Sequence, residues 1–498
     1  MKHTSISTKA VVKFSFKMSD HKKAWTQGIL ASSLLFSIST VFAQSSPLSP
    51  QQSQLRTIYQ ELVEINTTDS VGSCTQAAQA MQQRLKVGGY RDDEMKLIVP
   101  PDGPKKGNLV VRLAANVKPS NSSDTKKPLL LLAHIDVVEA KREDWLRDPF
   151  KLVEEGGFFY ARGASDDKAM AAIFVANMIR YKQEKLALKR DLILALTCDE
   201  ELVPAQFNGV EYLLKNHRNL IDAELALNEG GGGAMDSLGK PLRHSIQAGE
   251  KIFQTFQFEV SSSGGHSSQP RKENAIYRLA AGLGRLALYD FPFRLTPTTR
   301  GFFETMSKIE TGQLGADMKA VLGEPVDALA LARLSASTPF YNATLRTTCV
   351  ATMVNAGHAA NALPQRAQAT VNCRILPGET VAQTEAQLNS VLADPEIKIT
   401  RVGVATVSPV QPLHPELMKA ASEITQAMWP GVPLLPTMSV GGTDGRFLNN
   451  AGIWTYGVSG IFHYPEGANA HGLNERLPVK SLYEGQAFLY ALAKRLAE

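Results

Sequence analysis

An unbroken apolar run constrains the fold of this chain more than any other feature. Residues 129–133 read Leu-Leu-Leu-Leu-Ala, which is typical of a strand buried on both faces of a parallel sheet. The run ends in His134 and Asp136, two residues apart, so both side chains can share one face. Taken alone, this pair also fits a strand that simply ends in a turn. At the carboxyl end of a strand in an α/β sheet, however, it can serve a ligand cleft, where the imidazole binds a metal and the carboxylate orients it.

Two further apolar strands end in acidic residues. The strand at 191–197 is followed by acids at 199–201, and the strand at 225–228 is followed by Glu229. Asp166 precedes a helix expected at 168–182. The carboxyl ends of parallel strands meet at one sheet edge, and carboxylates that lie together repel one another unless a cation is present. Imidazole and oxygen ligands without thiolates suit zinc or a similar divalent ion. So many carboxylates favour two ions that share a bridging carboxylate.

The texture of the sequence changes near residue 248, where alternating strands and helices indicate a small α+β domain. A helical pattern at 410–428 and further strands then return to the first domain. We therefore predict an α/β protein, with a three-layer, mostly parallel sheet in its catalytic domain and an inserted α+β domain. The predicted boundaries are 44–247 and 406–498 for the two parts of the catalytic domain and 248–405 for the insertion. The predicted helices lie at 55–65, 77–87, 168–182, 210–217, 275–288, 302–309, 326–334, 380–392, 410–428 and 481–496. The predicted strands lie at 108–114, 129–134, 158–160, 191–197, 225–228, 253–260, 344–355, 366–376, 435–440 and 453–458. Ser165 or Asp166 is expected to cap the helix that begins at 168.

The first 43 residues resemble a signal peptide. They hold six lysines and one acidic residue, and the whole chain of 498 residues has a formal charge of +5, so the remainder is neutral. A neutral remainder indicates no basic surface for nucleic acid. A serine-containing apolar stretch at 28–41 leads to Ala43, after which we expect cleavage, with Met1 or Met18 as the true start. A membrane anchor is the alternative. We expect a periplasmic or secreted protein that has no membrane contact after signal removal.

Four cysteines, in a chain this long, do not predict a disulfide framework. An exported protein could pair them, but the sequence indicates no particular bridge. Cys198 stands beside the acids at 199–201 and is expected to be a buried thiol. The other three cysteines are Cys74, Cys349 and Cys373.

Nine short motifs, in order, resemble those of the di-zinc metallopeptidase and aminoacylase family. That family includes glutamate carboxypeptidase, aminoacylase, acetylornithine deacetylase, succinyl-diaminopimelate desuccinylase and carboxypeptidase S. The Trp-Leu-Arg-Asp-Pro-Phe segment at 145–150 and the doubled acid before Lys168 are closest to the carboxypeptidase S branch, whereas Ala161 and Ala169 stand where the family often has glycine. The motifs contain His134 and Asp136; Asp166 and Asp167; Glu200 and Glu201; Glu229; His266; Asn361; Arg374; Thr443 and Asp444; and His471 and Glu475.

The resemblance implies a ligand set and a mechanism. Two Zn²⁺ per subunit are implied, with Co²⁺ or Mn²⁺ also fitting. A hydroxide shared by the zincs would attack an amide carbonyl while Glu200 acts as general base. The inserted domain would be a lid and a dimerisation domain, through which a homodimer would form. The implied ligands are His134 and Glu229 for one zinc, Glu201 and His471 for the other, and Asp166 as the bridge, with Asp136 orienting His134.

The resemblance also implies roles for residues of the inserted domain. His266 would donate a hydrogen bond to the oxyanion; in dimeric relatives this histidine comes from the neighbouring subunit. The alternative for His266 is an ordinary flexible loop residue. Arg374 would bind the α-carboxylate of the released amino acid, assisted by Asn361 and Thr443. A structural ion pair is the alternative for Arg374.

The expected function is therefore zinc-dependent hydrolysis of small peptides or N-acyl amino acids next to a free carboxylate. A glutamate at position 229 resembles the carboxypeptidase and aminoacylase branches, whereas aminopeptidase and dipeptidase branches tend to have aspartate. One competing function is an aminopeptidase or dipeptidase of the same family. Another is a metal-dependent binding protein without catalysis, against which Glu200 argues, because a pure binder needs no base beside its ligand.

Overall fold

The computed structural model describes residues 47–117, 126–202 and 205–498. Contacts divide the chain into two units, Met1–Pro47 and Leu48–Glu498, and the second is the one with a described fold. The predicted signal peptide lies outside the described residues. Within the described ranges, no helix combines the length and apolarity that a membrane span requires.

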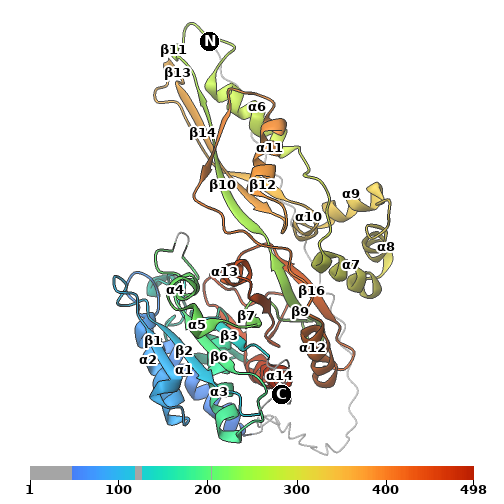
Figure 1. The fold of residues 1–498 in the computed structure, drawn as a ribbon. Helices are drawn as coiled ribbons and strands as arrows, with labels where there is room; N and C mark the ends of the chain where they lie inside the picture. The colour runs from blue at the N-terminus through green and yellow to red at the C-terminus, as the bar shows by residue number, and fades with distance from the viewer. Residues whose placement is uncertain (1–46, 118–125, 203–204) are drawn as a thin grey trace, which may run out of the picture. The chain divides into compact units, whose positions relative to one another are not determined.

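A ten-stranded mixed sheet forms the centre of this unit (Figure 1). Its order is β1-β2-β6-β3-β7-β17-β9-β8-β18, with β16 paired to β9, and the central strands β6, β3, β7 and β17 run parallel. The three strands predicted to end in ligands are therefore neighbours. The strands are β1 (Met95–Ile98), β2 (Asn108–Leu113), β3 (Leu129–His134), β6 (Leu192–Thr197), β7 (Leu225–Asn228), β8 (Gly233–Met235), β9 (Pro241–Glu250), β16 (Leu434–Ser439), β17 (Trp454–Gly457) and β18 (Phe462–His463).

The leucine run of β3 is apolar throughout because both faces of the sheet are covered. Leu129 and Leu131 belong to one core cluster, and Leu130 and Leu132 belong to another. All four are at most 1% exposed, and burial of each contributes roughly 1.5–3 kcal/mol. The predicted three-layer α/β architecture is confirmed. One layer contains α1 (Pro50–Glu64), α2 (Cys74–Val87), α3 (Lys168–Glu184), α12 (Pro415–Met428) and α14 (Val479–Ala497), and the other contains α4 (Gly209–Asn216), α5 (Arg218–Ile221) and α13 (Gly445–Asn450).

A separate four-stranded antiparallel sheet has the order β12-β14-β10-β15. Its strands are β10 (Ile252–Ser261), β12 (Thr348–Ala356), β14 (Arg366–Ile375) and β15 (Lys398–Val402). Alternate residues of β10 and β14 pack against α6 (Ala275–Ala287) and α11 (Val381–Leu392), which cover one face. This is the α+β arrangement predicted for the insertion, while the residues at which the domains divide remain predictions.

Three helices that follow α6 in the chain were only partly predicted. They are α7 (Pro297–Ile309), α8 (Gly312–Ala320) and α9 (Ala328–Ser337), and α10 (Pro339–Leu345) follows them. Because α10 occupies the start of the strand predicted at 344–355, that strand begins later, at Thr348. The short elements that remain are β4 (Val153–Glu155), β5 (Phe158–Tyr160) and β19 (Arg476–Pro478) in one small sheet, β11 (Gly265–His266) and β13 (Ala362–Leu363) in another, and two 3₁₀ turns, Asp92–Glu94 and Arg142–Asp144.

The predicted cap of α3 is wrong. Its N-cap is Asp167, which makes no side-chain capping bond. The side chain of Asp166 faces two histidines instead, at 3.1 and 3.2 Å. Gly163 precedes this loop with φ of +75°, and a β-carbon there would meet Val137 Cγ1 at 2.7 Å. The residues before α3 therefore position a functional loop rather than a conventional cap.

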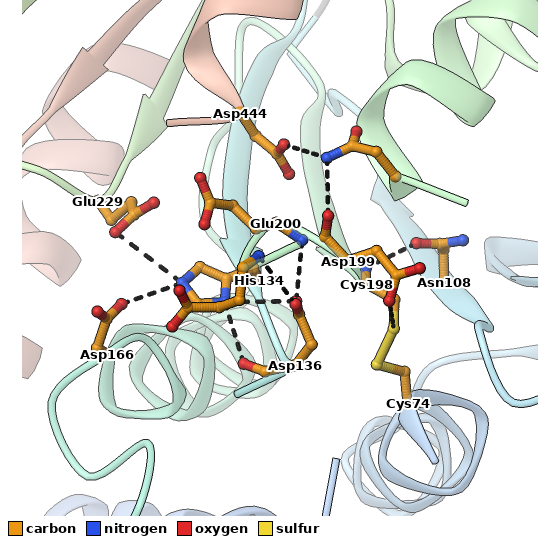
Figure 2. A network of polar contacts seen from close by, with 12 residues as sticks. Cys74, Asn108, His134, Asp136, Asp166, Cys198, Asp199, Glu200, Glu229 and Asp444 are labelled. Carbon is orange, nitrogen blue, oxygen red and sulfur yellow. Dashed lines mark hydrogen bonds and ion pairs between the residues drawn. A yellow bond between two sulfur atoms is a disulfide. The ribbon is translucent and has the colours of Figure 1, made fainter. Parts of the chain in front are cut away.

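The expectation that Cys198 is a buried free thiol is also wrong. Cys74 forms a disulfide with Cys198, 124 residues away, and Cys349 forms one with Cys373, 24 residues away. Cys198 is therefore not a free thiol. The first bond joins the start of α2 to the residue directly after β6 (Figure 2). The second joins paired positions of β12 and β14. Both pairings depend on tertiary contacts that residue spacing does not encode.

Candidate metal centre

The first potential ligand group lies around the end of β3. His134 Nε2 is 3.1 Å from Asp166 Oδ1 and 4.0 Å from Glu229 Oε2. Figure 2 shows both carboxylates directed at the His134 ring. One potential donor atom from each of these residues lies within 4.8 Å of the others. The structure therefore brings together three residues predicted from separate parts of the sequence.

The second group shares Asp166. His471 Nε2 is 3.2 Å from Asp166 Oδ2 and 2.9 Å from Glu201 Oε2. One potential donor atom from each of these three residues also lies within 4.8 Å of the others. Asp166 thus presents Oδ1 to one group and Oδ2 to the other. A carboxylate with one oxygen in each of two ligand groups has the geometry of a bridge between two cations.

Asp136 contacts residues at the ends of two neighbouring strands, β3 and β6. Its backbone carbonyl is 3.2 Å from His134 Nδ1, and its Oδ1 is 3.5 Å from the same atom. Its carboxylate also accepts hydrogen bonds from the backbone N–H groups of Glu200 and Glu201, at 3.3 and 3.1 Å. One side chain therefore fixes the His134 ring, leaving Nε2 for a metal, and fixes the segment that carries two functional glutamates.

The three glutamates of the cluster favour protonation because they are buried. Burial raises the pKa of Glu200 and of Glu229 well above the usual value. Burial, with the charge of Asp166, raises the pKa of Glu201 to about 7. A divalent cation would favour the ionised forms. The oxygen-and-imidazole donor set fits zinc, cobalt or manganese.

The pKa values of His134 and His471 are raised as well, which for an imidazole favours the charged form. Burial alone would lower the pKa of His134, but hydrogen bonds to Asp136 and Asp166 outweigh it and raise the pKa well above its usual value. A hydrogen bond to Asp166 raises the pKa of His471 to about 9. In Asp166 the burial effect is outweighed by the two histidines, so its pKa is lowered. The protonated imidazoles thus supply positive charge at the positions where a bound metal ion would supply it.

An ion pair that sequence reasoning missed connects the Asp166 and His471 loops. Glu475, 0% exposed, accepts hydrogen bonds from the backbone N–H groups of Ser165 and Asp166 at 2.8 and 3.0 Å. Its other oxygen binds Arg162 at 2.9 Å, and Arg162 donates to the Gly472 carbonyl at 3.0 Å. Glu475 belonged to a recognised motif, and its position four residues after His471 was the available signal.

A cavity of about 540 Å³ opens beside the cluster. Glu200 lines it together with Arg374, as expected of a base and a carboxylate-binding residue that serve one substrate. Thr443 is buried nearby but does not line this cavity; its N–H donates to Glu250 at 2.6 Å and its Oγ1 accepts from Gly445 at 3.0 Å. The residues that line the cavity are Glu200, Glu201, Lys251, Phe253, Arg374, Val404, Thr406, Gly441, Gly442, Arg446 and His471.

His266 and Asn361 do not line this cavity. Both are exposed. His266 pairs with Ala362 across the β11–β13 ladder, and its Nδ1 is 2.7 Å from Ser268 Oγ. The Asn361 carbonyl accepts a hydrogen bond from the Ser267 N–H at 3.1 Å. The structure therefore brings these two predicted residues close to each other, but not to the metal cluster of the same chain.

Comparison with known proteins decides the family. The profile of peptidase family M20/M25/M40 matches residues 130–495, which is most of the chain. The chain belongs to this family. Human N-fatty-acyl-amino acid synthase/hydrolase PM20D1 is 29% identical to this M20/M25/M40 protein over 380 residues, which cover 74% of each chain. Probable carboxypeptidase S-like 2 of Dictyostelium discoideum is 27% identical over 386 residues, covering 74% of this chain and 72% of that protein.

Solved structures give the same result for the fold. The M20 family metallo-carboxypeptidase Sso-CP2 from Sulfolobus solfataricus superposes with a TM-score of 0.63 at 20% identity, over 90% of this chain and 99% of that one. The resemblance to the family and to its carboxypeptidase S-like branch is thereby confirmed. This M20/M25/M40 protein is a metal-dependent hydrolase of amide bonds, a carboxypeptidase or an acyl-amino acid hydrolase.

Proposed function

We propose that this protein uses two zinc ions to cleave the amide bond next to an amino acid with a free α-carboxylate. The observation that carries the proposal is the placement of Asp166 between two ligand groups, the second of which contributes Glu201 and His471 to the cavity that Glu200 and Arg374 line. His134 and Glu229 would hold one ion, Glu201 and His471 would hold the other, and Asp166 would offer one carboxylate oxygen to each group. The names of the human and Dictyostelium relatives support both N-acyl amino acids and peptides as substrates.

The proposed chemistry depends on the placement of Glu200. When bound, a pair of divalent cations supplies Lewis acidity to an amide carbonyl and lowers the pKa of water. The Glu200 carboxylate accepts a proton from the attacking water and returns it to the leaving nitrogen. Burial raises the pKa of Glu200, and a pKa nearer neutrality suits a group that must serve as base and then as acid. Arg374 binds the α-carboxylate and so fixes which amide bond reaches Glu200.

A Glu200→Gln variant tests this assignment. We expect two zinc equivalents in wild type and variant alike, with kcat reduced by roughly 10²–10⁴-fold on N-acetyl amino acids. Elemental analysis and steady-state kinetics measure the two quantities. Glu211→Gln, an exposed glutamate on α4, is the matched control. Unchanged turnover in Glu200→Gln would remove Glu200 from the mechanism.

Substrate comparison tests the function itself. Hydrolysis of N-acetyl amino acids but not of amino acid amides supports the proposal, because only the former retain the carboxylate. The reverse preference would identify an aminopeptidase. Metal binding without hydrolysis of either class would identify a binding protein.

We further propose that the protein is exported and acts as a homodimer. Two disulfides and the lysine-rich, then apolar, first 43 residues support an oxidising compartment outside the cytoplasm. N-terminal sequencing of the exported protein should begin at Gln44. Strand β12 supports the dimer, because Val350, Met353 and Val354 are 61%, 69% and 64% exposed on a strand with one unpaired edge among the described residues.

A further inference from the structure

Three basic residues line the same cavity as Glu200. They are Lys251, Arg374 and Arg446. Within residues 47–117, 126–202 and 205–498, none of the three has a carboxylate oxygen within 4.0 Å. Binding one α-carboxylate through a single arginine would leave the other two charges without a function in the cavity.

Arg374 and Lys251 are held in fixed positions by neutral groups. The Arg374 guanidinium carbon lies 4.6 Å from the centre of the Phe253 ring, the residue paired with Arg374 across β10 and β14. Lys251 Nζ donates to the Arg346 carbonyl at 2.7 Å and to Thr348 Oγ1 at 3.3 Å. Thr348 is the residue opposite Arg374 on β12, so the ammonium lies beside the Arg374 position. Neutral partners orient both side chains, and burial lowers the pKa of Lys251 to about 7, so Arg374 is the more firmly charged of the two.

Arg446 comes from a different part of the fold. It lies on α13, against the central sheet, with its guanidinium carbon 4.8 Å from the centre of the Phe447 ring. Two buried acids feel its charge, and each uses one oxygen elsewhere: Glu250 accepts the Thr443 N–H at 2.6 Å, and Asp444 accepts the Asn208 side-chain amide at 2.6 Å. The second oxygen of each acid has no hydrogen-bond partner among the described residues, and neither acid lies within 4.0 Å of the Arg446 guanidinium nitrogens. A β-carbon on Gly442 would meet Arg446 Nη1 at 2.8 Å, so the glycine leaves room for the guanidinium on the cavity wall.

The two guanidinium groups are close enough to repel each other. Burial, and then the charge of Arg446, lower the pKa of Arg374. Two like charges facing one half-buried cavity are stabilised by an anion placed between them. A carboxylate has about four acceptor positions, enough for the donors of two arginines.

We propose that Arg446 is a second carboxylate-binding residue, so that the α-carboxylate of the substrate is held between Arg374 on β14 and Arg446 on α13. This inference depends on the proposed function of the site. A free carboxylate then connects the four-stranded sheet to the central sheet at the mouth of the metal centre. An uncharged carboxamide at the same place loses interactions with both arginines. Arg446 thus determines that the enzyme selects substrates with a free carboxyl end.

A double-mutant cycle between protein and substrate tests the inference. The substrates are N-acetyl-leucine and N-acetyl-leucine amide, in which the same acetyl bond is cleaved. We expect wild type to prefer the acid by roughly 10³-fold in kcat/KM, and Arg446→Met to reduce that preference by about 10–100-fold, mainly through KM. Arg446→Lys should be intermediate, because it keeps the charge but loses the fork. Arg243→Met, an exposed arginine on β9, is the matched control.

Each contrary result has a distinct meaning. Equal losses on the acid and the amide would show that Arg446 is structural and would overturn the inference. A loss confined to N-acetyl-glutamate relative to N-acetyl-glutamine would show that Arg446 recognises a side-chain carboxylate, which would also overturn it. If wild type cleaves neither leucine substrate nor a dipeptide, the proposed function fails. If Arg446→Met does not fold, the acid preference of Arg446→Lys decides: an unchanged preference overturns the inference.

Discussion

His244 shows how a single buried side chain makes the stability of this protein depend on pH. It lies on β9, 0% exposed, with Nδ1 2.8 Å from Thr425 Oγ1, and its Nε2 has no hydrogen-bond partner among the residues that the structure describes. The rings of Trp429, Phe462 and Phe488 surround it, at 5.6, 5.5 and 4.7 Å between ring centres. Burial lowers the pKa of His244 to about 3. The folded protein therefore keeps this ring neutral where the unfolded chain would protonate it.

The sign of the effect follows from proton uptake. Between pH 6.5 and 3 the unfolded chain binds a proton at His244 that the folded protein does not, so stability falls as the pH falls through this window. We expect wild type to lose roughly 1–2 kcal/mol more than His244→Gln between pH 6.5 and 5. Urea unfolding at both pH values measures the difference. Exposed His358→Gln is the control, and identical pH slopes in wild type and His244→Gln would contradict the prediction.

Single residues of the metal centre differed in how far the sequence predicted them. His134, Glu201 and Glu229 follow from strand ends alone, because β6, β3 and β7 are neighbours. His471 lies in a loop at φ +60°, and only family resemblance indicated it. Arg446 was not predicted at all, because an unpaired arginine in a cavity looks the same in a sequence as one on an ordinary surface.

At the scale of secondary structure elements, the disulfide between α2 and the end of β6 has the clearest consequence. Cys198 stands two residues before Glu200 and three before Glu201, and its N–H donates to Asn108 Oδ1 at 3.0 Å. Asp199 follows with φ of +62°, its Oδ1 2.7 Å from Lys106 Nζ. The bond therefore restrains the segment that carries Glu200 and Glu201, the proposed base and the proposed ligand.

Removing this bond should affect both stability and metal affinity. We expect the Cys74→Ala/Cys198→Ala double variant to lose roughly 2–4 kcal/mol of stability and to bind zinc more weakly. Cys349→Ala/Cys373→Ala is the control: its shorter separation of 24 residues, against 124, predicts a loss smaller by about 1–1.5 kcal/mol. It should leave zinc affinity unchanged. Denaturant unfolding and competitive chelation measure these effects, and equal zinc affinity in both variants would refute the link to Glu201.

Hydrophobic periodicity predicted most elements, and it failed where polar residues are buried. Strand β9 was missed because His244, Gln247 and Glu250 all face the interior, which removes the alternation that identifies a strand. The central strands were recognised because their apolar runs cover both faces. The first helix, predicted at 55–65, begins earlier, at Pro50, because Ser49 caps α1. Local capping chemistry outweighed the polar composition there.

At the scale of the whole molecule, the proposed dimer would give exposed residues of the insertion a catalytic role. His266 and Asn361 lie together at the β11–β13 ladder, and neither lines the cavity of its own chain. The residue pattern alone does not indicate this placement; only the family resemblance pointed to a histidine supplied by a neighbouring subunit. If His266 acts, it must then reach the metal centre of a neighbouring subunit or move within its own chain.

Mixing two inactive variants distinguishes these two routes. Glu200→Gln keeps His266 but lacks the base, whereas His266→Ala keeps the base. Co-expressed with different tags, the two variants form mixed dimers in which one of two sites has both residues only if His266 acts across the interface. Random pairing then restores roughly a quarter of wild-type activity, and the purified mixed dimer restores about half. Mixed dimers without activity would assign His266 to its own chain, and a monomeric, fully active protein would exclude the dimer altogether. Met353→Asp on β12 should separate the subunits and abolish the recovered activity, because a buried charge at the edge strand opposes pairing.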